Sequence, residues 1–189
     1  MNIYIDETLS MEHVASTHVD AIYALVLANR SHLAQWLPWV EHVENIHFIE
    51  NFVRASQLRT SDGLEHAFVI IRNGEIVGRI GIYKIDVQNR IGEIGYWLAE
   101  KKQGKGIVTK ACSALLDFCF HNLQLNRIEI KCGTENHKSQ TIPERLHFKL
   151  EGILREAEFV REAFIDLHLY ALMKNDHISA KKNLSHLTL

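Results

Sequence analysis

Apolar residues in the first third of the chain follow a helical spacing. They recur at intervals of three and four residues in two segments, 19–28 and 46–53, which places them on one face of a helix in each case. Between these segments, Pro38 should end or kink a helix and bring Trp36 and Trp39 close together. We expect both tryptophans to pack in the core, because large aromatic side chains dominate core burial; the alternative is that they line a pocket.

The next region changes to the period of a β-strand. Segments 66–72 ("HAFVIIR") and 75–85 ("EIVGRIGIYKI") are joined by Asn73-Gly74. This dipeptide suits a tight type I′ turn, because both central residues of that turn need a positive φ. We therefore predict an antiparallel hairpin.

Segment 91–100, "IGEIGYWLAE", is predicted as a further strand. Alternation places Glu93 and Trp97 on one face and Tyr96 on the other. Two glycines, Gly92 and Gly95, weaken the strand, and glycines are tolerated in strands where another backbone or a ligand approaches closely. We expect something to lie along this strand.

The stretch "QGKG" at 103–106 lies between that strand and an amphipathic helix that begins at Ile107. Free N–H groups and the positive end of the dipole at a helix N-terminus favour an anion, above all a phosphate. A Walker A loop cannot be placed on Gly104 and Gly106, and a dinucleotide fingerprint would need glycine where Thr109 stands. The stretch predicts a phosphate-bearing cofactor, and a glycine-rich turn without a ligand is the alternative.

The last third returns to mixed patterns. Segment 126–132 ("NRIEIKC") alternates as a strand, a short helix is expected near 139–148, and two strands follow at 149–159 and 163–173. Pro143 is unexpected inside the short helix, because proline removes a helical hydrogen bond.

Composition and charge narrow the classes of protein. With 189 residues and 47% hydrophobic residues, one domain is expected over 1–189, with its core at about 8–176 and a C-terminal tail at 177–189. A net charge of -2 gives no reason to expect binding to nucleic acid or to an anionic membrane. The polar N-terminus and the lack of an apolar run of about 20 residues predict a cytoplasmic protein.

Cysteine and histidine give no sign of a metal or a covalent nucleophile. Cys112, Cys119 and Cys132 lie in apolar patterns, which suits reduced core thiols. His137, His147 and the three cysteines never approach paired-ligand spacing such as CxxC or HxxxH, so no metal is expected. Cys112 and Cys119 fall on the apolar stripe of the predicted helix, where a thiol should be inert.

Segment 103–108, "QGKGIV", resembles the acetyl-CoA loop of the GCN5-related N-acetyltransferases, which reads Gln or Arg, two residues, Gly, one residue, then Gly or Ala. Val108 departs from the last position, where the Rim-type ribosomal-protein N-acetyltransferases are similar in carrying a larger apolar residue. The stretches "RSHLAQWLPWV", "IGYWLAEKKQGKGI", "NHKSQTIPERLHFKLEG" and "REAFIDLHLYAL" extend this resemblance over nearly the whole chain.

The resemblance implies an α/β (α+β) fold with a mixed, mostly antiparallel sheet, helices on both faces, and strands that splay beside "GYWL". It also implies an acetyl-CoA-dependent N-acetyltransferase that works by direct attack in a ternary complex, on the α-amine of a protein such as a ribosomal protein. A homodimer is implied on the same ground. Two alternatives stay open: an enzyme that acetylates a small amine such as a polyamine or an aminoglycoside, and a non-catalytic acyl-CoA-binding sensor.

Cofactor-binding residues follow from the same resemblance. Backbone N–H groups near Trp97 and Leu98 would meet the thioester carbonyl oxygen. Asn136 would contact the cofactor arm. The pyrophosphate would be held by the loop made of Gln103, Gly104, Lys105, Gly106, Ile107 and Val108. The alternative for Lys105 is an ordinary surface lysine.

Acetyl transfer to an amine needs an uncharged nitrogen, stabilisation of negative charge on the carbonyl oxygen, and a proton for the departing thiolate. Many members of the family carry a tyrosine that acts as the general acid at the position of Pro143. In the Rim-type enzymes a serine is proposed to protonate the thiolate instead, and it corresponds to Ser139. The alternative for Ser139 is a helix N-cap. The candidate bases are Glu158, acting through water, and Glu93, and either could be an ion-paired or surface glutamate.

Overall fold

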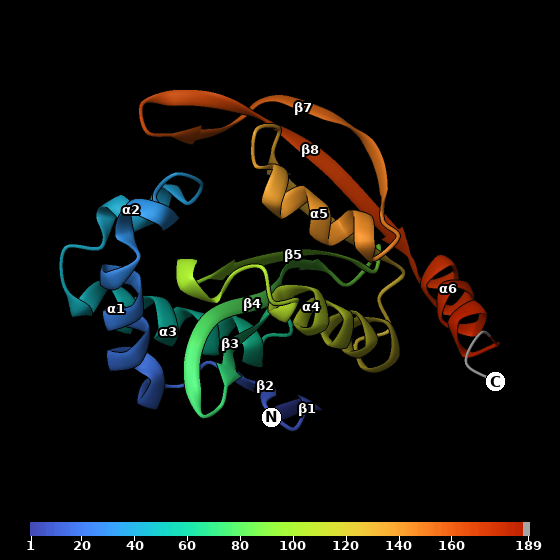
Figure 1. Cartoon of the computed structure of the whole chain (residues 1–189), viewed down its shortest axis with the longest axis horizontal. Helices are drawn as coiled ribbons and strands as arrows, with labels where there is room; N and C mark the ends of the chain where they lie inside the picture. Colours follow the sequence, from blue (N-terminus) through green and yellow to red (C-terminus); the bar gives the residue numbers. More distant parts are fainter. Residues whose placement is uncertain (187–189) are drawn as a thin grey trace.

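The computed structural model of the protein describes residues 1–186. One eight-stranded sheet runs through the molecule in the order β1-β2-β3-β4-β5-β6-β8-β7 (Figure 1). Strands β5 and β6 pair in parallel, and every other pair in the sheet is antiparallel. The expectation of a mixed, mostly antiparallel sheet is confirmed.

The elements alternate along the chain. The strands are β1 (Asn2–Asp6), β2 (Leu9–His13), β3 (His66–Arg72), β4 (Glu75–Asp86), β5 (Ile91–Leu98), β6 (Arg127–Gly133), β7 (Lys149–Val160) and β8 (Ala163–Met173). The helices are α1 (Val19–Ala28), α2 (Arg30–Leu33), α3 (Ile46–Ser61), α4 (Ile107–Asp117), α5 (His137–Arg145) and α6 (Lys174–His186). Shorter helical turns are η1 (Ser16–His18), η2 (Pro38–His42), η3 (Glu100–Lys102) and η4 (Phe118–Asn122).

Helices cover both faces of the central strands (Figure 1). Phe68, Ile80 and Ile94 point to the face that packs on α4, whereas Val69 and Trp97 point to the face that packs on α1 and α3. Each fully buried side chain of this kind contributes about 1.5–3 kcal/mol to folding. The predicted two-sided arrangement is confirmed, and so is the face assigned to Trp97.

Residues next to α3 determine where this helix begins and where it ends. The side chain of Asn45 accepts a hydrogen bond from the His47 N–H at 3.0 Å, which satisfies one free donor at the start of the helix. The chain leaves the helix at Gly63, whose φ of +73° suits a glycine. The apolar positions at 46–53 lie in this helix as predicted, and the helix continues to Ser61.

The β3–β4 hairpin has the predicted turn. Arg72 pairs with Glu75, and the two residues between them, Asn73 and Gly74, have φ values of 51° and 78°. Both are positive, as a type I′ turn requires. The sequence prediction is confirmed residue for residue.

Strands β5 and β6 separate halfway along their length. Their pairing ends at Glu93 with Glu129, whereas β5 stays paired with β4 as far as Leu98 with Gly78. The half of β5 from residue 94 to residue 98 therefore has an open edge where β6 has moved away. The predicted splay beside "GYWL" is confirmed.

The C-terminal segment predicted as a tail coincides in part with α6. In this helix His177 is buried, with its ring 5.1 Å from that of Phe120, and residues 187–189 lie outside the described part. Within residues 1–186, no helix combines the length and the apolar character needed to cross a membrane.

Candidate active site

The loop before α4 presents bare backbone. Gly104 and Gly106 have φ values of +73° and +69°, and a Cβ added to either would meet nothing within 4 Å. Conformation, not crowding, therefore requires glycine here. The Lys110 N–H bonds to the Gly106 carbonyl at 3.0 Å in the first full turn, so the N–H groups of residues 107–109 precede the helical ladder. This geometry fits the anion site predicted from "QGKG".

Some side chains of the loop are buried in the core and others lie on the surface. Ile107 is buried, and Val108 is partly buried and packs against the same core cluster, so both anchor the start of α4 to the core. Lys105 is exposed. Gln103 bridges two helices: its Nε2 lies 2.8 Å from His32 Nε2 on α2, and its Oε1 accepts from Lys138 Nζ on α5 at 3.3 Å. The side chain of Gln103 thus ties α2 to α5 across the loop.

The open edge of β5 offers its own hydrogen-bond donors. The Ala99 N–H donates to the Val77 carbonyl at 2.9 Å, toward β4. Because backbone directions alternate along a strand, the Trp97 N–H also points toward β4, and the N–H groups of Tyr96 and Leu98 point to the side that β6 has left. Of the two residues predicted from the sequence, Leu98 has the available N–H. Trp97 contributes its side chain instead.

Ser139 lies in the first turn of α5, but it is not the N-cap. Asn136 takes that role, because its Oδ1 accepts from the Ser139 N–H at 3.2 Å. The alternative of an N-cap at Ser139 is therefore wrong. The Ser139 hydroxyl donates to the Tyr96 hydroxyl at 3.2 Å, and the Tyr96 hydroxyl donates to the Ser139 carbonyl at 3.0 Å. Burial raises the pKa of Tyr96, so this phenol stays protonated.

Pro143 explains why the Ser139 carbonyl is free for Tyr96. In a regular helix that carbonyl would accept from the N–H four residues later, and proline has none. The helix nevertheless continues past Pro143 to Arg145, so α5 covers 137–145 and not the predicted 139–148. The proline that was unexpected in the sequence thus opens the hydrogen-bonding position that Tyr96 uses.

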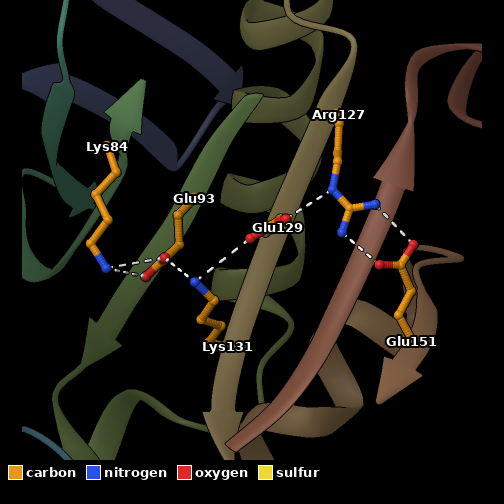
Figure 2. Close-up of polar contacts among 6 residues, drawn as sticks. All are labelled: Lys84, Glu93, Arg127, Glu129, Lys131 and Glu151. Carbon is orange, nitrogen blue, oxygen red and sulfur yellow. Dashed lines mark hydrogen bonds and ion pairs between the residues drawn. The ribbon is translucent and has the colours of Figure 1, made fainter. Parts of the chain in front are cut away.

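Glu93 belongs to a chain of ion pairs that links residues of strands β4, β5, β6 and β7 (Figure 2). Its carboxylate accepts from Lys84 Nζ at 3.2 Å and from Lys131 Nζ at 2.8 Å. The chain continues through Glu129, Arg127 and Glu151. Burial alone would raise the pKa of Glu93, but the two ammonium groups outweigh it and lower that pKa. The ion-paired alternative holds for Glu93.

Glu158 has the opposite electrostatic environment. It lies half-buried on β7, next to an irregularity in the β7–β8 register between Leu154 and Glu158. Burial first, and then the nearby Glu93 carboxylate, raise the pKa of Glu158. The structure therefore brings the two candidate bases within electrostatic reach and shifts their pKa values in opposite directions. A raised pKa suits a general base that works near neutral pH, and this favours Glu158.

A cavity of about 720 Å³ lies between α3 and the sheet. Its lining includes Trp39, Phe48, Phe52, Arg79, Tyr83 and Trp97. The ring of Trp39 stacks on Phe48 at 6.4 Å and tilts against Trp97 at 6.4 Å, so Trp39 lines a pocket. Trp36 lies elsewhere, with its ring 3.0 Å from where a Cβ on Gly133 would stand. Trp39 both packs against the core and lines the cavity, whereas Trp36 is half-buried and belongs to neither core cluster, so the core-packing prediction is wrong for Trp36.

The two glycines of β5, Gly92 and Gly95, have different surroundings. A Cβ on Gly92 would lie 2.6 Å from Ile82 Cδ1, so that glycine accommodates core packing and not a ligand. Gly95 lines the cavity. At Gly92 the expected approach of a backbone or a ligand is wrong, because a side chain of the protein itself lies there; at Gly95 it stays a prediction.

The thiols are buried. Burial raises the pKa of Cys112 to about 12 and also raises that of Cys119, which keeps both in the unreactive thiol form predicted from the sequence. Within residues 1–186, no three His, Cys, Asp or Glu side chains gather as a metal site would require.

Two residues of the site, Tyr96 and Arg79, were not predicted from the sequence. Tyr96 was placed on the correct face, but its partner Ser139 is 43 residues away and no local pattern links them. Arg79 gave a clearer signal, because it is a single cation inside the otherwise apolar strand segment "IVGRIGIY". A buried charge in a central strand indicates a ligand or an ion pair.

Residues 8–149 match the acetyltransferase (GNAT) domain family. The chain belongs to the GNAT acetyltransferase family. It is 35% identical over 169 residues to the ribosomal-protein-serine acetyltransferase of Escherichia coli K12, covering 89% of this chain and 94% of that protein. It is 26% identical over 136 residues to the spermidine N(1)-acetyltransferase of the same organism, covering 70% and 73%.

A solved GNAT structure has the same fold as this chain. It is the ribosomal L7/L12 α-N-protein acetyltransferase RimL in complex with coenzyme A, with a TM-score of 0.90 and 30% identity, covering 93% of this chain and 99% of that one. The similarity thus extends over nearly the whole of both chains.

Proposed function

We propose that this GNAT enzyme transfers the acetyl group of acetyl-CoA to the α-amine of a protein N-terminus, and that the acceptor is a ribosomal protein. One observation carries the acceptor class: the 35% identity to a ribosomal-protein-serine acetyltransferase spans 94% of that relative. The relative that acetylates spermidine is less similar and is matched over a shorter part of its length.

The donor side of the site fits a phosphate-bearing thioester. The positive-φ glycines 104 and 106 and the free N–H groups at the start of α4 would hold the pyrophosphate, with Lys105 adding positive charge beside it. Asn136 would contact the cofactor arm. Acetyl-CoA would supply an activated acyl carbon, and the Leu98 N–H on the open edge of β5 would donate to its carbonyl oxygen.

Two residues of this chain would transfer the protons, and a third would position one of them. Glu158 would take a proton from the acceptor amine through a water molecule, since its raised pKa suits that task and Glu93 is held by two lysines. The nitrogen then forms the new bond to the acyl carbon as the carbon–sulfur bond breaks. Ser139 would donate the proton that the departing sulfur needs, and Tyr96 keeps the hydroxyl of Ser139 in place.

The acceptor cavity argues against a polyamine. Its buried cation is Arg79, and a second guanidinium, that of Arg59, also lines it. Arg59 is paired with Glu65, so the uncompensated charge is that of Arg79, and it would repel a multiply charged amine because like charges in a desolvated site are costly. A non-catalytic sensor would need the phosphate loop but not Ser139 or Glu158. The homodimer implied by the resemblance stays a prediction.

An acceptor panel tests the proposal. Peptides with Ser, Ala, Met or Thr at the N-terminus and spermidine would each be incubated with acetyl-CoA, and thiol release and product mass would be followed. We expect transfer to one class of peptide and none to spermidine. Transfer to spermidine alone would support the small-amine alternative. Acetyl-CoA binding without acceptor-dependent thiol release would support the sensor.

A further inference from the structure

Arg79 is an unusual residue in the wall of the cavity. It lies on β4, is 5% exposed, and its guanidinium carbon stacks 3.9 Å from the centre of the Phe52 ring. Its Nη2 donates to the Tyr83 hydroxyl at 3.4 Å, and its Nε is buried without a hydrogen-bond partner among residues 1–186. A guanidinium carries five N–H donors, so most of its capacity is unused.

The charge of Arg79 is also not matched by a contacting carboxylate. Glu65 is a nearby acid, but it forms an ion pair with Arg59 and accepts from the Ser56 hydroxyl at 2.5 Å. Arg59 and Glu65 compensate each other, which leaves one net positive charge at Arg79 facing the cavity. Burying a charge without a partner is expensive, so the site is incomplete until an anion or a strong acceptor enters.

The cavity leads to the place of acetyl transfer. Gly95, Tyr96 and Trp97 line it, and they belong to the half of β5 that β6 has left open. A neighbouring hollow of about 500 Å³ shares Arg59 and Tyr83 with the cavity and includes Glu93. A peptide whose amine lies at the open edge of β5 would therefore extend along this wall toward Arg79.

We propose that the cavity binds the first residues of the acceptor and that Arg79 donates hydrogen bonds to the carboxylate of an acidic side chain close to the acceptor N-terminus. This inference rests on the proposed function. A carboxylate fits better than a neutral carbonyl, because it offers two oxygens to the planar guanidinium and cancels its charge. The aromatic walls formed by Trp39 and Phe52 suit the apolar part of a neighbouring residue.

Peptides that differ in one residue test the inference. Each begins with the N-terminal residue that the enzyme accepts, and Asp, Asn or Lys stands in turn at the second, third or fourth position. At one position we expect Asp to exceed Asn in kcat/KM by about ten- to a hundredfold, mainly through KM, since a hydrogen bond to a charged group is strong. Lys should be the poorest. Equal kcat/KM for Asp and Asn at every position would overturn the inference.

Variants assign the preference to Arg79. Arg79→Gln should remove the preference for Asp, and Arg79→Lys should keep part of it. Arg54→Gln is the matched control, because it removes one positive charge from the exposed side of α3 and should leave the preference intact. If Arg79→Gln fails to fold, the wild type and Arg79→Lys decide, since a preference that does not weaken in Arg79→Lys contradicts the assignment.

A binding readout separates this inference from the proposed function. Trp39 and Trp97 line the cavity, so occupancy should change tryptophan fluorescence. Efficient transfer to neutral and acidic peptides alike would leave the proposed function standing and overturn the inference. If no peptide is acetylated, the proposed function fails; a fluorescence change caused by the Asp peptide but not by the Asn peptide would then still support the inference, and no change with either would overturn it.

Discussion

The hydroxyl of Tyr96 on β5 donates to the carbonyl of Ser139 on α5 at 3.0 Å and accepts from the hydroxyl of the same serine at 3.2 Å. This two-point contact is available because Pro143 cannot occupy the Ser139 carbonyl from within the helix. It holds the proposed proton donor against the strand whose open edge, in our proposal, would receive the acyl group. Tyr96 is therefore the residue that positions Ser139.

Tyr96→Phe should lower kcat about tenfold while the KM for acetyl-CoA stays within about twofold. The ring still packs in the core, but Ser139 loses its orientation, and two hydrogen bonds are lost at a cost of about 1–2 kcal/mol in unfolding free energy. Steady-state kinetics and thermal melting measure both effects. Pro143→Ala is the companion variant: it keeps both hydroxyls but restores a competing N–H, and its kcat should lie between those of the wild type and Tyr96→Phe.

Ser139→Ala should lower kcat about a hundredfold or more, with little change in the affinity for acetyl-CoA, because a positioned proton donor acts on the transition state. Stopped-flow or steady-state turnover is compared with acetyl-CoA binding by calorimetry. Thr141→Ala, which changes another hydroxyl on α5, is the control and should retain turnover. Unchanged turnover in Ser139→Ala would remove Ser139 from the role of acid.

Glu158→Gln and Glu93→Gln should affect the pH dependence differently. A base must be deprotonated, so kcat falls as the pH drops through the raised pKa of Glu158, and Glu158→Gln should lower kcat and remove this acidic limb. In Glu93→Gln the limb should move to lower pH, because the carboxylate of Glu93 helps to raise the pKa of Glu158. The readout is kcat at saturating acceptor, corrected for ionisation of the amine, whose pKa is about 8. An intact limb in Glu158→Gln would exclude Glu158 as the base.

Gly106→Ala should weaken acetyl-CoA binding without filling any occupied space. At a φ of +69° an alanine is strained by about 1–2 kcal/mol, so the loop should relax away from its conformation. Gly152→Ala is a matched control, because a Cβ there also meets nothing within 4 Å but no positive φ is involved. Calorimetric titration of coenzyme A compares the two; equal affinities would contradict a role for the loop conformation.

Stability should fall in mild acid because of two stacked histidines. His13 and His66 lie 5.4 Å apart, and burial first, then neighbouring positive charge, lowers the pKa of His13 to about 4; burial also lowers that of His66. The unfolded chain therefore binds protons more readily below about pH 6.5, so stability is complete above that pH and is lost as the pH falls toward 4. His13→Phe should reduce the drop in melting temperature between pH 7 and pH 5, whereas the exposed His47→Gln should not.

Much of this architecture could be predicted from local patterns. The Asn73-Gly74 turn, the two faces of β5 and the loop before α4 each depend on a few consecutive residues, so their spacing carries the information. The conformation of the β7–β8 turn could not be read in this way: Arg161 and Glu162 adopt φ values of 47° and 67° without a glycine or an asparagine. Tertiary pairing of the two long strands overrides the local preference there.

The candidate site depended more on contacts between distant segments. Ser139 and Glu158 were chosen by resemblance, but only the fold shows that Tyr96 holds the serine and that Lys84 and Lys131 hold Glu93. Arg79 lines the cavity because its strand packs against α3, where Phe52 lies. The spacing of residues along the sequence does not reveal this contact. Tertiary packing decides which charged groups and hydroxyls of distant segments come into contact, so local sequence patterns do not predict these contacts.

The most direct measurement is the position of the acetyl group on a peptide that carries both an N-terminal serine and an internal lysine. After incubation with acetyl-CoA and enzyme, tandem mass spectrometry assigns the modified nitrogen. We predict acetylation of the α-amine, with the lysine ε-amine unmodified and with loss of the product in Ser139→Ala. Acetylation of the lysine, or no product while acetyl-CoA still binds, would contradict the proposal of an N-terminal acetyltransferase.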